Sequence, residues 1–383
     1  MKRHIFVSTC EFSGDMHGEV LVQELQKRLP EARFTGIGGR RMAAAGVQLL
    51  YDPTAKSTIG FFEALRNLRR LKKLVGEIVA FWEKDRPDVV IWLDSGGFNL
   101  VLAKEAKRMG IPVVCMFSPS AWAYGEDRAR KLAERVRLLL AVLPFESDFY
   151  RKFGVNVVSV GHPLIDRVQS RMSPLEYRAK LGLDPEQKLV ALLPGSRRQE
   201  VARLLPVMLE TITGLNDASL QLVLPVATSI DRDWLESILS QYPVKVTVTG
   251  GDVYELMAAA DAAIIASGTA TLEAAIIGVP MVIIYRVSGL SYFIYKRLES
   301  PERRVVRPWI GLPNLIAGAS VVPEVLQKDL TPENVRAALQ TMLYDPEVNL
   351  RIRRALQQVR EKIGPPGVMT RVAGLIADLI ENG

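Results

Sequence analysis

Cysteine and histidine are scarce in this sequence. Cys10 and Cys115 are the only cysteines among 383 residues, too few for a disulfide framework, so a reducing compartment is expected. The three histidines, His4, His17 and His162, lie far apart, so we predict no metal site and no cofactor. Because no histidine is arranged to activate it, Cys10 is interpreted as a core thiol rather than a nucleophile.

Long apolar runs are also missing. No stretch approaches the roughly 20 apolar residues that span a bilayer. The longest candidate, Ala274 to Val287, is broken by Gly278 and Pro280. The first apolar run stops at Ser8 and is too short for a signal-peptide core. We therefore expect a cytoplasmic protein whose membrane contact, if any, is peripheral.

The net charge is positive. Lys plus Arg (49) exceed Asp plus Glu (42), for a formal charge of +7, which favours an anionic partner. Nucleic acid, a phosphorylated metabolite and an acidic lipid surface all fit, but the sequence contains no recognisable nucleic-acid reader motif, so no nucleic-acid partner is expected. A hydrophobic content of 48% with 24% charged residues excludes wholesale disorder and a polytopic membrane protein.

Short β-branched runs alternate with helical patterns twice along the chain. Strands that are apolar on both faces and separated by helices are typical of parallel sheets covered on both sides. The sequence therefore predicts an α/β protein with two doubly wound, Rossmann-like domains. The expected strands are His4 to Ser8, Arg33 to Gly38, Asp88 to Leu93, Val113 to Phe117, Leu138 to Val142 and Val157 to Val160, then Lys188 to Leu193, Leu220 to Pro225, Val244 to Thr247, Ala262 to Ala266 and Met281 to Tyr285.

Three prolines, Pro163, Pro174 and Pro185, mark the joint between the two patterns. We expect residues 1–166 to form the first domain and 167–350 the second. The pattern of residues 351–383 predicts charged helices. We expect them to pack back on the first domain or on a partner chain, and in the second case the protein would be a homodimer.

In open parallel sheets, ligands bind beyond the carboxyl ends of the strands. Glu11 follows the first strand and Asp94 follows the strand Val89 to Leu93. A carboxylate after a fully apolar strand is partly desolvated and suited to take a proton, which makes Asp94 the leading candidate base and Glu11 a second catalytic candidate. The alternatives are that Asp94 only binds amides of its own turn, and that Ser13 or Asp15 merely caps a helix.

Two turns of the second pattern favour an anion. Gly195, Ser196 and Arg197 follow a strand and open a helix, which gathers amides and a guanidinium around one small volume. Ser267, Gly268 and Thr269 precede another helix, on which Glu273 could accept hydrogen bonds from ribose hydroxyls. Together these turns predict a nucleoside diphosphate pocket; a solvated basic turn and an ordinary capped helix are the alternatives. No Walker loop or dinucleotide fingerprint is present.

A basic amphipathic helix is predicted between Thr58 and Trp82. Its cationic face could bind an anionic leaflet, at about 1 kcal/mol per basic residue. The alternative is the solvated face of a core helix. The expected membrane-facing residues are Phe61, Phe62, Leu65, Arg66, Arg69 and Arg70.

Ordered motifs along nearly the whole chain carry a family resemblance. They are Glu11 to Asp15, Gly36 to Gly39, Ile59 to Glu63, Pro87 to Asp94, Phe98-Asn99, Ser118 to Ala123, Leu143 to Glu146, Gly161 to Pro163, Leu193 to Arg197, Ala266 to Glu273 and Leu312 to Leu315. With them the sequence resembles the lipid-A-disaccharide synthase family, whose GT-B glycosyltransferase fold implies two domains facing a central cleft.

The resemblance implies transfer of an acylated glucosamine from UDP-2,3-diacylglucosamine to 2,3-diacylglucosamine 1-phosphate, with inversion and release of UDP. It implies that Asp94 is the essential aspartate, that Arg197 and the Ser267 to Thr269 turn bind the diphosphate, and that Glu273 and Asn314 lie at the ribose and the reacting sugar. It also implies a location peripheral to the inner face of the cytoplasmic membrane. The sequence departs from the family at Ser95 to Gly97, where a proline and a second carboxylate are usual, and at Cys10 and Tyr124.

Two rival functions remain open from sequence. A UDP-N-acetylglucosamine 2-epimerase would use the same fold without a lipid acceptor. A nonenzymatic protein that binds nucleotide or lipid would use the same pocket without needing Asp94 as a base.

Overall fold

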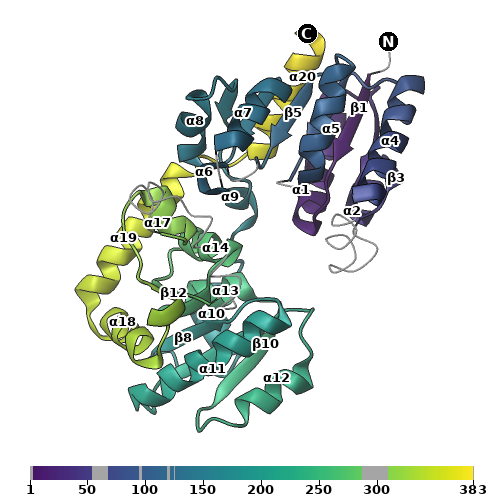
Figure 1. Cartoon of the computed structure of the whole chain (residues 1–383). Helices are drawn as coiled ribbons and strands as arrows, with labels where there is room; N and C mark the ends of the chain where they lie inside the picture. Colours follow the sequence, from purple (N-terminus) through teal and green to yellow (C-terminus); the bar gives the residue numbers. More distant parts are fainter. Residues whose placement is uncertain are drawn as a thin grey trace. The chain divides into compact units, whose positions relative to one another are not determined.

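The computed structural model describes residues 3–53, 68–94, 97–118, 121–124, 126–286 and 309–382 (Figure 1). The chain forms two compact units. The N-terminal unit comprises Met1–Pro163 and Ile363–Gly383, and the C-terminal unit comprises Leu164–Lys362. The boundaries expected from sequence lie after residues 166 and 350.

The N-terminal unit is built on a parallel sheet of seven strands in the order β3-β2-β1-β4-β5-β6-β7. Its strands are β1 (His4–Ser8), β2 (Arg33–Ile37), β3 (Val47–Tyr51), β4 (Val89–Trp92), β5 (Val113–Met116), β6 (Leu138–Ala141) and β7 (Val157–Ser159). Its helices are α1 (Phe12–Arg28), α2 (Arg40–Ala44), α4 (Leu68–Lys84), α5 (Gly97–Arg108), α6 (Ala121–Tyr124), α7 (Glu126–Arg135), α8 (Pro144–Arg151) and α20 (Val368–Asn382).

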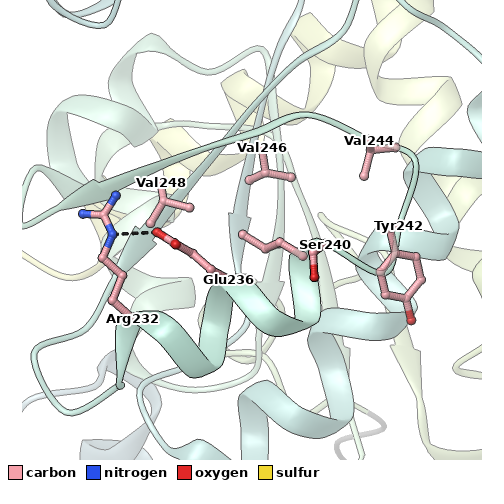
Figure 2. A pocket seen from close by; sticks show the side chains of 8 residues that line it. Arg232, Glu236, Ser240, Tyr242, Val244, Val246 and Val248 are labelled. Atoms are coloured by element: carbon pink, nitrogen blue, oxygen red, sulfur yellow. Dashed lines mark hydrogen bonds and ion pairs between the residues drawn. The ribbon is translucent and has the colours of Figure 1, made fainter.

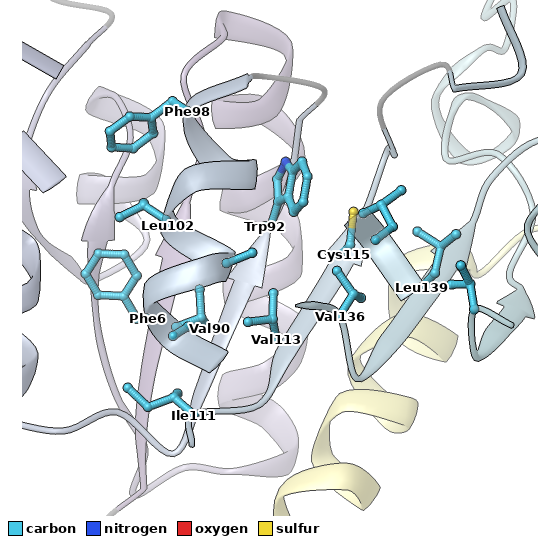
Figure 3. Packing of buried hydrophobic residues seen from close by; sticks show 14 of the residues in the cluster. Phe6, Val90, Trp92, Phe98, Leu102, Ile111, Val113, Cys115, Val136 and Leu139 are labelled. Carbon is cyan, nitrogen blue, oxygen red and sulfur yellow. The ribbon is translucent and has the colours of Figure 1, made fainter. Parts of the chain in front are cut away.

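Every residue of the central strands β1, β4, β5 and β6 is buried, as the doubly apolar runs predict. One face of this sheet packs against α4, α5 and α7, which contribute to one buried cluster. Figure 3 shows part of this cluster, with Phe98 and Leu102 of α5 beside strand residues such as Val90. Phe6 meets Trp82 of α4 edge to face at a centroid distance of 5.1 Å, and Trp92 and Phe98 lie in the same cluster. This packing fixes the strand ends from which the site residues project.

The last helix of the chain, α20, belongs to the N-terminal unit. It packs against α1 and buries Val372, Ile376 and Ile380. Thr370 Oγ1 donates a hydrogen bond of 2.9 Å to Glu24 of α1. The C-terminal segment is therefore part of the first Rossmann-like unit.

The C-terminal unit has a parallel sheet of six strands in the order β10-β9-β8-β11-β12-β13. Its strands are β8 (Leu189–Leu193), β9 (Gln221–Val226), β10 (Val246–Gly250), β11 (Ala262–Ala266), β12 (Met281–Tyr285) and β13 (Glu324–Leu326). Its helices are α9 (Leu164–Arg167), α10 (Pro174–Lys180), α11 (Arg198–Leu215), α12 (Arg232–Leu239), α13 (Val253–Ala259), α14 (Thr269–Ile277), α17 (Leu312–Ala317), the 3-10 turn Gln327–Asp329, α18 (Pro332–Tyr344) and α19 (Pro346–Lys362). The prediction of two doubly wound units is confirmed.

Helix α19 packs within the C-terminal unit, against α14, α17 and α18. The buried residues Ile352, Leu356 and Val359 form its apolar face. Of the charged helices expected at the C-terminus, only α20 joins the N-terminal unit.

The predicted membrane face lies largely outside the described residues. Phe61, Phe62, Leu65 and Arg66 are not among them, and neither are the side chains of Arg69 and Arg70 in α4. Further along α4, Ile78 and Trp82 are buried in the core. No helix in the described part of the chain is both long and apolar enough to cross a bilayer.

A buried arginine ties together the amino ends of the strands in the C-terminal unit. Arg178 of α10 donates to the carbonyls of Asp184, Pro185, Gln187 and Ala259, and to the Asp261 carboxylate at 2.9 Å. Only 8% of its side chain is exposed. The guanidinium therefore links α10 to the segments that lead into β8 and β11.

We expect Arg178→Met to lower the free energy of unfolding by about 3 to 5 kcal/mol, because it leaves a carboxylate and several buried carbonyls without their donor. Urea denaturation followed by circular dichroism measures this. Arg232→Met is the matched control, since exposed Arg232 makes an i,i+4 pair with Glu236 and its loss should cost less than about 1 kcal/mol. Equal effects of the two substitutions would contradict the assigned role of Arg178.

Candidate active site

The carboxyl ends of β1 and β4 place the two candidate carboxylates on neighbouring strands. β1 pairs with β4 in parallel, with Ser8 opposite Trp92. The turn Thr9 to Glu11 therefore lies beside Asp94 although 83 residues separate Glu11 from Asp94. Sequence predicted both positions at the end of a strand, and strand pairing brings them together.

Asp94 is buried and accepts several hydrogen bonds. Its Oδ2 accepts from Thr9 Oγ1 at 3.0 Å, from the Glu11 amide at 3.1 Å and from the Cys10 amide. The carboxylate thus binds amides of the β1–α1 turn, which follows a neighbouring strand. Donors of this kind fix the orientation of the carboxylate.

A second group of polar side chains orients Asp94 from α5. Asn99 Nδ2 donates to Asp94 Oδ1 at 2.7 Å, and Ser8 Oγ donates to Asn99 Oδ1 at 2.6 Å. All three residues are at most 3% exposed. Sequence analysis did not assign Ser8 or Thr9 to the site, because both residues also fit the end of a buried strand.

Packing explains the glycine in the segment that follows Glu11. A Cβ on Gly14 would lie 1.9 Å from Thr9 Oγ1, so the turn closes only with glycine there. Asp15 does not cap its own helix. Its carboxylate accepts from the amides of Gly39 at 2.7 Å and Met42 at 3.1 Å and so caps α2.

An aromatic group also lies at this edge of the N-terminal unit. The ring of Phe117, which follows β5, stacks on His17 of α1 at 4.6 Å and meets His162 at 6.1 Å. Phe117 has a φ of +57°, which is uncommon for a residue with a side chain and is held by the surrounding packing. Desolvation lowers the pKa of His162 to about 3, so this imidazole is neutral near pH 7. Sequence singled out none of the three for this site.

A buried carboxyl supports the loop after β5. Glu146, on α8, accepts from Ser118 Oγ at 3.3 Å and from the Val142 and Leu143 amides. Ser118 Oγ also lies 2.9 Å from the Tyr150 hydroxyl, within hydrogen-bond distance. Burial raises the pKa of Glu146, although the two amides oppose the shift. Glu146 therefore holds Ser118 in a fixed position. Ser118 begins one of the motifs that carry the family resemblance.

In the C-terminal unit, the turn after β8 presents a glycine and an exposed arginine. Gly195 has a φ of +110°, and a Cβ there would lie 2.7 Å from Glu200 Oε2. Arg197 is the N-cap residue of α11, and its Nη1 pairs with Glu200 Oε1 at 2.7 Å. Ser229 Oγ donates to the Ser196 carbonyl at 2.6 Å, which braces the turn. With 78% of its side chain exposed, Arg197 can reach a ligand at the start of α11.

The second predicted turn opens α14. Gly268 is its N-cap residue, and no side chain caps the first amides of the helix. Neither Ser267 nor Thr269 therefore acts as the ordinary cap that was the alternative. Because β8 pairs with β11, the turns after both strands lie at the same edge of the sheet. Helix N-termini carry partial positive charge, so this edge suits an anion.

Glu273, one turn along α14, is bound by two residues that sequence missed. Tyr254 of α13 donates to Glu273 Oε1 at 2.9 Å, and Arg167 Nη2 lies 3.6 Å from the same oxygen. Arg167 also donates to the Tyr254 hydroxyl at 3.3 Å. No motif marks either residue, because their partners are distant in sequence.

Asn314, expected near the reacting sugar, makes its hydrogen bonds within the C-terminal unit. It is fully buried, and its Nδ2 donates to the Val322 carbonyl and to Glu324 Oε1, both at 2.8 Å. Its Oδ1 accepts from the amides of Val321 at 2.8 Å and Val322 at 3.0 Å. A bond to a sugar would require one of these four bonds to break. In this structure Asn314 holds the loop before β13.

A surface pocket of about 370 Å³ lies between α12 and β10 in the C-terminal unit (Figure 2). Val244, Val246 and Val248 line it together with Tyr242 and the Arg232–Glu236 pair. None of the predicted site residues lines this pocket. Among the described residues, no group of three or more histidine, cysteine or acidic side chains could hold a metal ion.

Comparison with known proteins gives one consistent family. The family model for lipid-A-disaccharide synthetase matches residues 5–367. The lipid-A-disaccharide synthase of Geobacter metallireducens is 40% identical over 380 residues, which cover 99% of this chain and 97% of that protein. The same enzyme from Myxococcus xanthus is 37% identical over 381 residues, which cover 99% of this chain and 98% of that protein.

Solved structures resemble the chain at the level of the fold. The calicheamicin glycosyltransferase CalG4 matches with a TM-score of 0.62 at 17% identity, covering 100% of this chain and 98% of that one. A UDP-GlcNAc 2-epimerase from Neisseria meningitidis bound to UDP-GlcNAc matches with a TM-score of 0.63 at 14% identity, covering 100% of both chains. These neighbours establish a GT-B architecture of two Rossmann-like units.

Both cysteines should resist alkylation in the native state. Burial raises the pKa of Cys10 and Cys115 well above its usual value, and the charges of Asp94 and Glu11 raise that of Cys10 further. The thiolate is the nucleophile, so at about pH 8 iodoacetamide should react more than about 10-fold more slowly than with a free thiol. Mass spectrometry after timed quenching measures the rate, and unfolding in guanidinium chloride should make both thiols react. Rapid native labelling of Cys10 would contradict its interpretation as a core thiol.

Asn99→Ala should destabilise the N-terminal unit by about 1 to 3 kcal/mol, because it removes a buried donor to Asp94 Oδ1 and the buried acceptor of the Ser8 hydroxyl. Chemical denaturation checks this. Asn156→Ala is the control, since exposed Asn156 donates a single bond to the Arg137 carbonyl and its loss should cost less than about 1 kcal/mol.

Proposed function

Because the chain belongs to the lipid-A-disaccharide synthetase family, we propose that it is an inverting glycosyltransferase that forms the lipid A disaccharide. It transfers an acylated glucosamine from UDP-2,3-diacylglucosamine to 2,3-diacylglucosamine 1-phosphate and releases UDP. The match over residues 5–367, which includes both Rossmann-like units, carries this proposal.

The C-terminal unit binds the donor in this proposal. The amides at the start of α14, next to Ser267, Gly268 and Thr269, receive the diphosphate together with Gly195, Ser196 and Arg197. Helix N-termini and a guanidinium stabilise the negative charge that grows on the leaving UDP. Two observations support this arrangement: the first amides of α14 have no side-chain cap, and Arg197 is exposed. Asn314 then acts by holding the loop before β13.

Arg197 already has an anionic partner in the absence of a donor. Its pair with Glu200 is a short-range i,i+3 pair at the surface, which contributes little to stability. A diphosphate carries more charge and can replace the glutamate as the partner of Arg197. Glu200 thus keeps the guanidinium near the α11 N-terminus until the donor binds.

The N-terminal unit supplies the carboxylates in this proposal. Inversion is a single displacement, so a base must take the proton of the attacking hydroxyl as the diphosphate leaves. We assign this role to Asp94 and a second catalytic role to Glu11, whose backbone amide Asp94 binds. The hydrogen bonds from Thr9 and Asn99 support the assignment, because a base must be held in the correct orientation.

The proposed chemistry implies an acylated acceptor and contact with a membrane. Both substrates carry acyl chains, so the enzyme would work at the inner face of the cytoplasmic membrane. The net charge of +7 suits an anionic leaflet, and the segment from Phe61 to Arg70 is the proposed contact. A homodimer is compatible with the proposal and is not needed for it.

A UDP-N-acetylglucosamine 2-epimerase is the less favoured function. Its structural neighbours share the fold at 13% and 14% identity. The family model and the relatives that are 36% to 40% identical all carry the name of the disaccharide synthase or synthetase. The family match therefore decides between the two.

The transfer reaction tests the proposal directly. Purified protein supplied with UDP-2,3-diacylglucosamine should release UDP only when the monosaccharide 1-phosphate acceptor is present, and mass spectrometry should detect the disaccharide 1-phosphate. Asp94→Ala should lower turnover by about 100-fold or more through loss of the base. UDP binding by this variant, measured by calorimetry, should be unchanged, because Asp94 lies in the other unit from the donor residues. Acceptor-independent UDP release would instead favour the epimerase, and unchanged turnover in the variant would favour a nonenzymatic binding protein.

A further inference from the structure

The carboxylate of Glu273 is held by a relay of hydrogen bonds. Arg167 Nη2 donates to the Tyr254 hydroxyl at 3.3 Å, and that hydroxyl donates to Glu273 Oε1 at 2.9 Å. The Arg167 guanidinium also lies 3.6 Å from Oε1. A donor that itself accepts from a cation is polarised, which strengthens the bond to the carboxylate.

Only one oxygen of Glu273 takes part in this relay. Within the described residues, Oε1 accepts the hydrogen bond from Tyr254 and the ion pair of Arg167, while Oε2 appears in no hydrogen bond or ion pair. The side chain is 14% exposed, so a ligand can reach the carboxylate but bulk solvent largely cannot. Because the relay fixes the plane of the carboxylate, it also fixes the direction in which Oε2 points.

Helix geometry relates this oxygen to the proposed diphosphate site. Thr269 and Glu273 are i and i+4 residues of α14 and so share one face of the helix. One turn of helix rises about 5.4 Å, a length comparable with the separation of a nucleotide's phosphate from its ribose hydroxyls. A nucleotide with its diphosphate at Thr269 would place its ribose near Glu273.

Tyr254 keeps its proton over a wide pH range. Burial raises the pKa of this phenol, and the neighbouring Glu273 carboxylate raises it further, against the opposing effect of Arg167. The hydroxyl therefore remains a hydrogen-bond donor at neutral and mildly alkaline pH.

We propose that Tyr254 and Arg167 are positioning residues that aim Glu273 at the ribose hydroxyls, and that this triad selects ribonucleotide over deoxyribonucleotide donors. The inference rests on the proposed function, since it needs a nucleoside diphosphate at the α14 N-terminus. The triad would account for the selectivity for the sugar of the nucleotide, because a ribose hydroxyl that donates to a partly buried, oriented carboxylate contributes more to binding than one that donates to water.

The triad makes a specific prediction about nucleotide binding. Wild-type protein should bind UDP at least about 10-fold more tightly than 2′-deoxy-UDP or 3′-deoxy-UDP, whichever lacks the hydroxyl that Glu273 binds. In Tyr254→Phe the carboxylate loses its donor. Affinity for UDP should then fall by about 3- to 10-fold while affinity for the weaker deoxynucleotide stays nearly constant, so the ratio shrinks. Isothermal titration calorimetry measures all three ligands.

Tyr344→Phe provides a matched control. The Tyr344 hydroxyl also donates to a carboxylate, that of Asp217, within the same unit but on α18, away from the proposed nucleotide site. Its removal should leave all affinities and the selectivity ratio unchanged. Thermal denaturation of both variants establishes that they are folded.

The outcomes separate this inference from the proposed function. Failure of wild-type protein to bind UDP or UDP-sugar would overturn the donor site itself. UDP binding with an unchanged selectivity ratio in Tyr254→Phe would overturn the triad and leave the transferase proposal standing. An equal loss of affinity for UDP and both deoxynucleotides would also overturn it, because that pattern indicates a general structural role.

Discussion

Buried carboxylates that bind backbone amides hold the loops at the carboxyl edge of the sheet in the N-terminal unit. Asp94 binds the amides of the β1–α1 turn, Asp15 caps α2, and Glu146 binds the amides at the start of α8. In the C-terminal unit, Glu324 binds the amides of residues 310 and 311. The first three are buried, so the donors that converge on each of them offset the cost of removing a carboxyl group from water. Loops held in this way can present side chains in fixed positions without regular secondary structure.

The two units use opposite charges at these edges. Fixed carboxylates gather where the N-terminal unit ends its strands, whereas helix N-termini and Arg197 mark the same edge of the C-terminal unit. Transfer of a sugar from a nucleoside diphosphate needs both, because a proton must be accepted while an anion departs. In the proposed reaction, this contrast assigns each unit its task on chemical grounds.

Much of the architecture was predictable because central parallel strands are apolar on both faces. Every strand expected from sequence is present. The strands that were missed, β3 and β13, are edge strands: β3 alternates between buried and less buried residues, and β13 has three residues with one buried. Strands of this kind lack the continuous apolar run that marks a central strand. The positions of the last two helices were harder to predict. Helices α19 and α20 are both amphipathic, and the pattern alone does not say which unit each apolar face covers.

The sequence by itself determined the two doubly wound units, the family and the residues that follow each strand, because periodicity and motifs are local properties. Only the tertiary structure decided what those residues bind. Strand order β3-β2-β1-β4 places Asp94 beside a turn 83 residues earlier, and packing of α9, α13 and α14 brings Arg167 and Tyr254 to Glu273. It also showed that Asn314 spends its hydrogen bonds on its own loop. Hydrogen-bond partners depend on which elements become neighbours, and no local pattern records that.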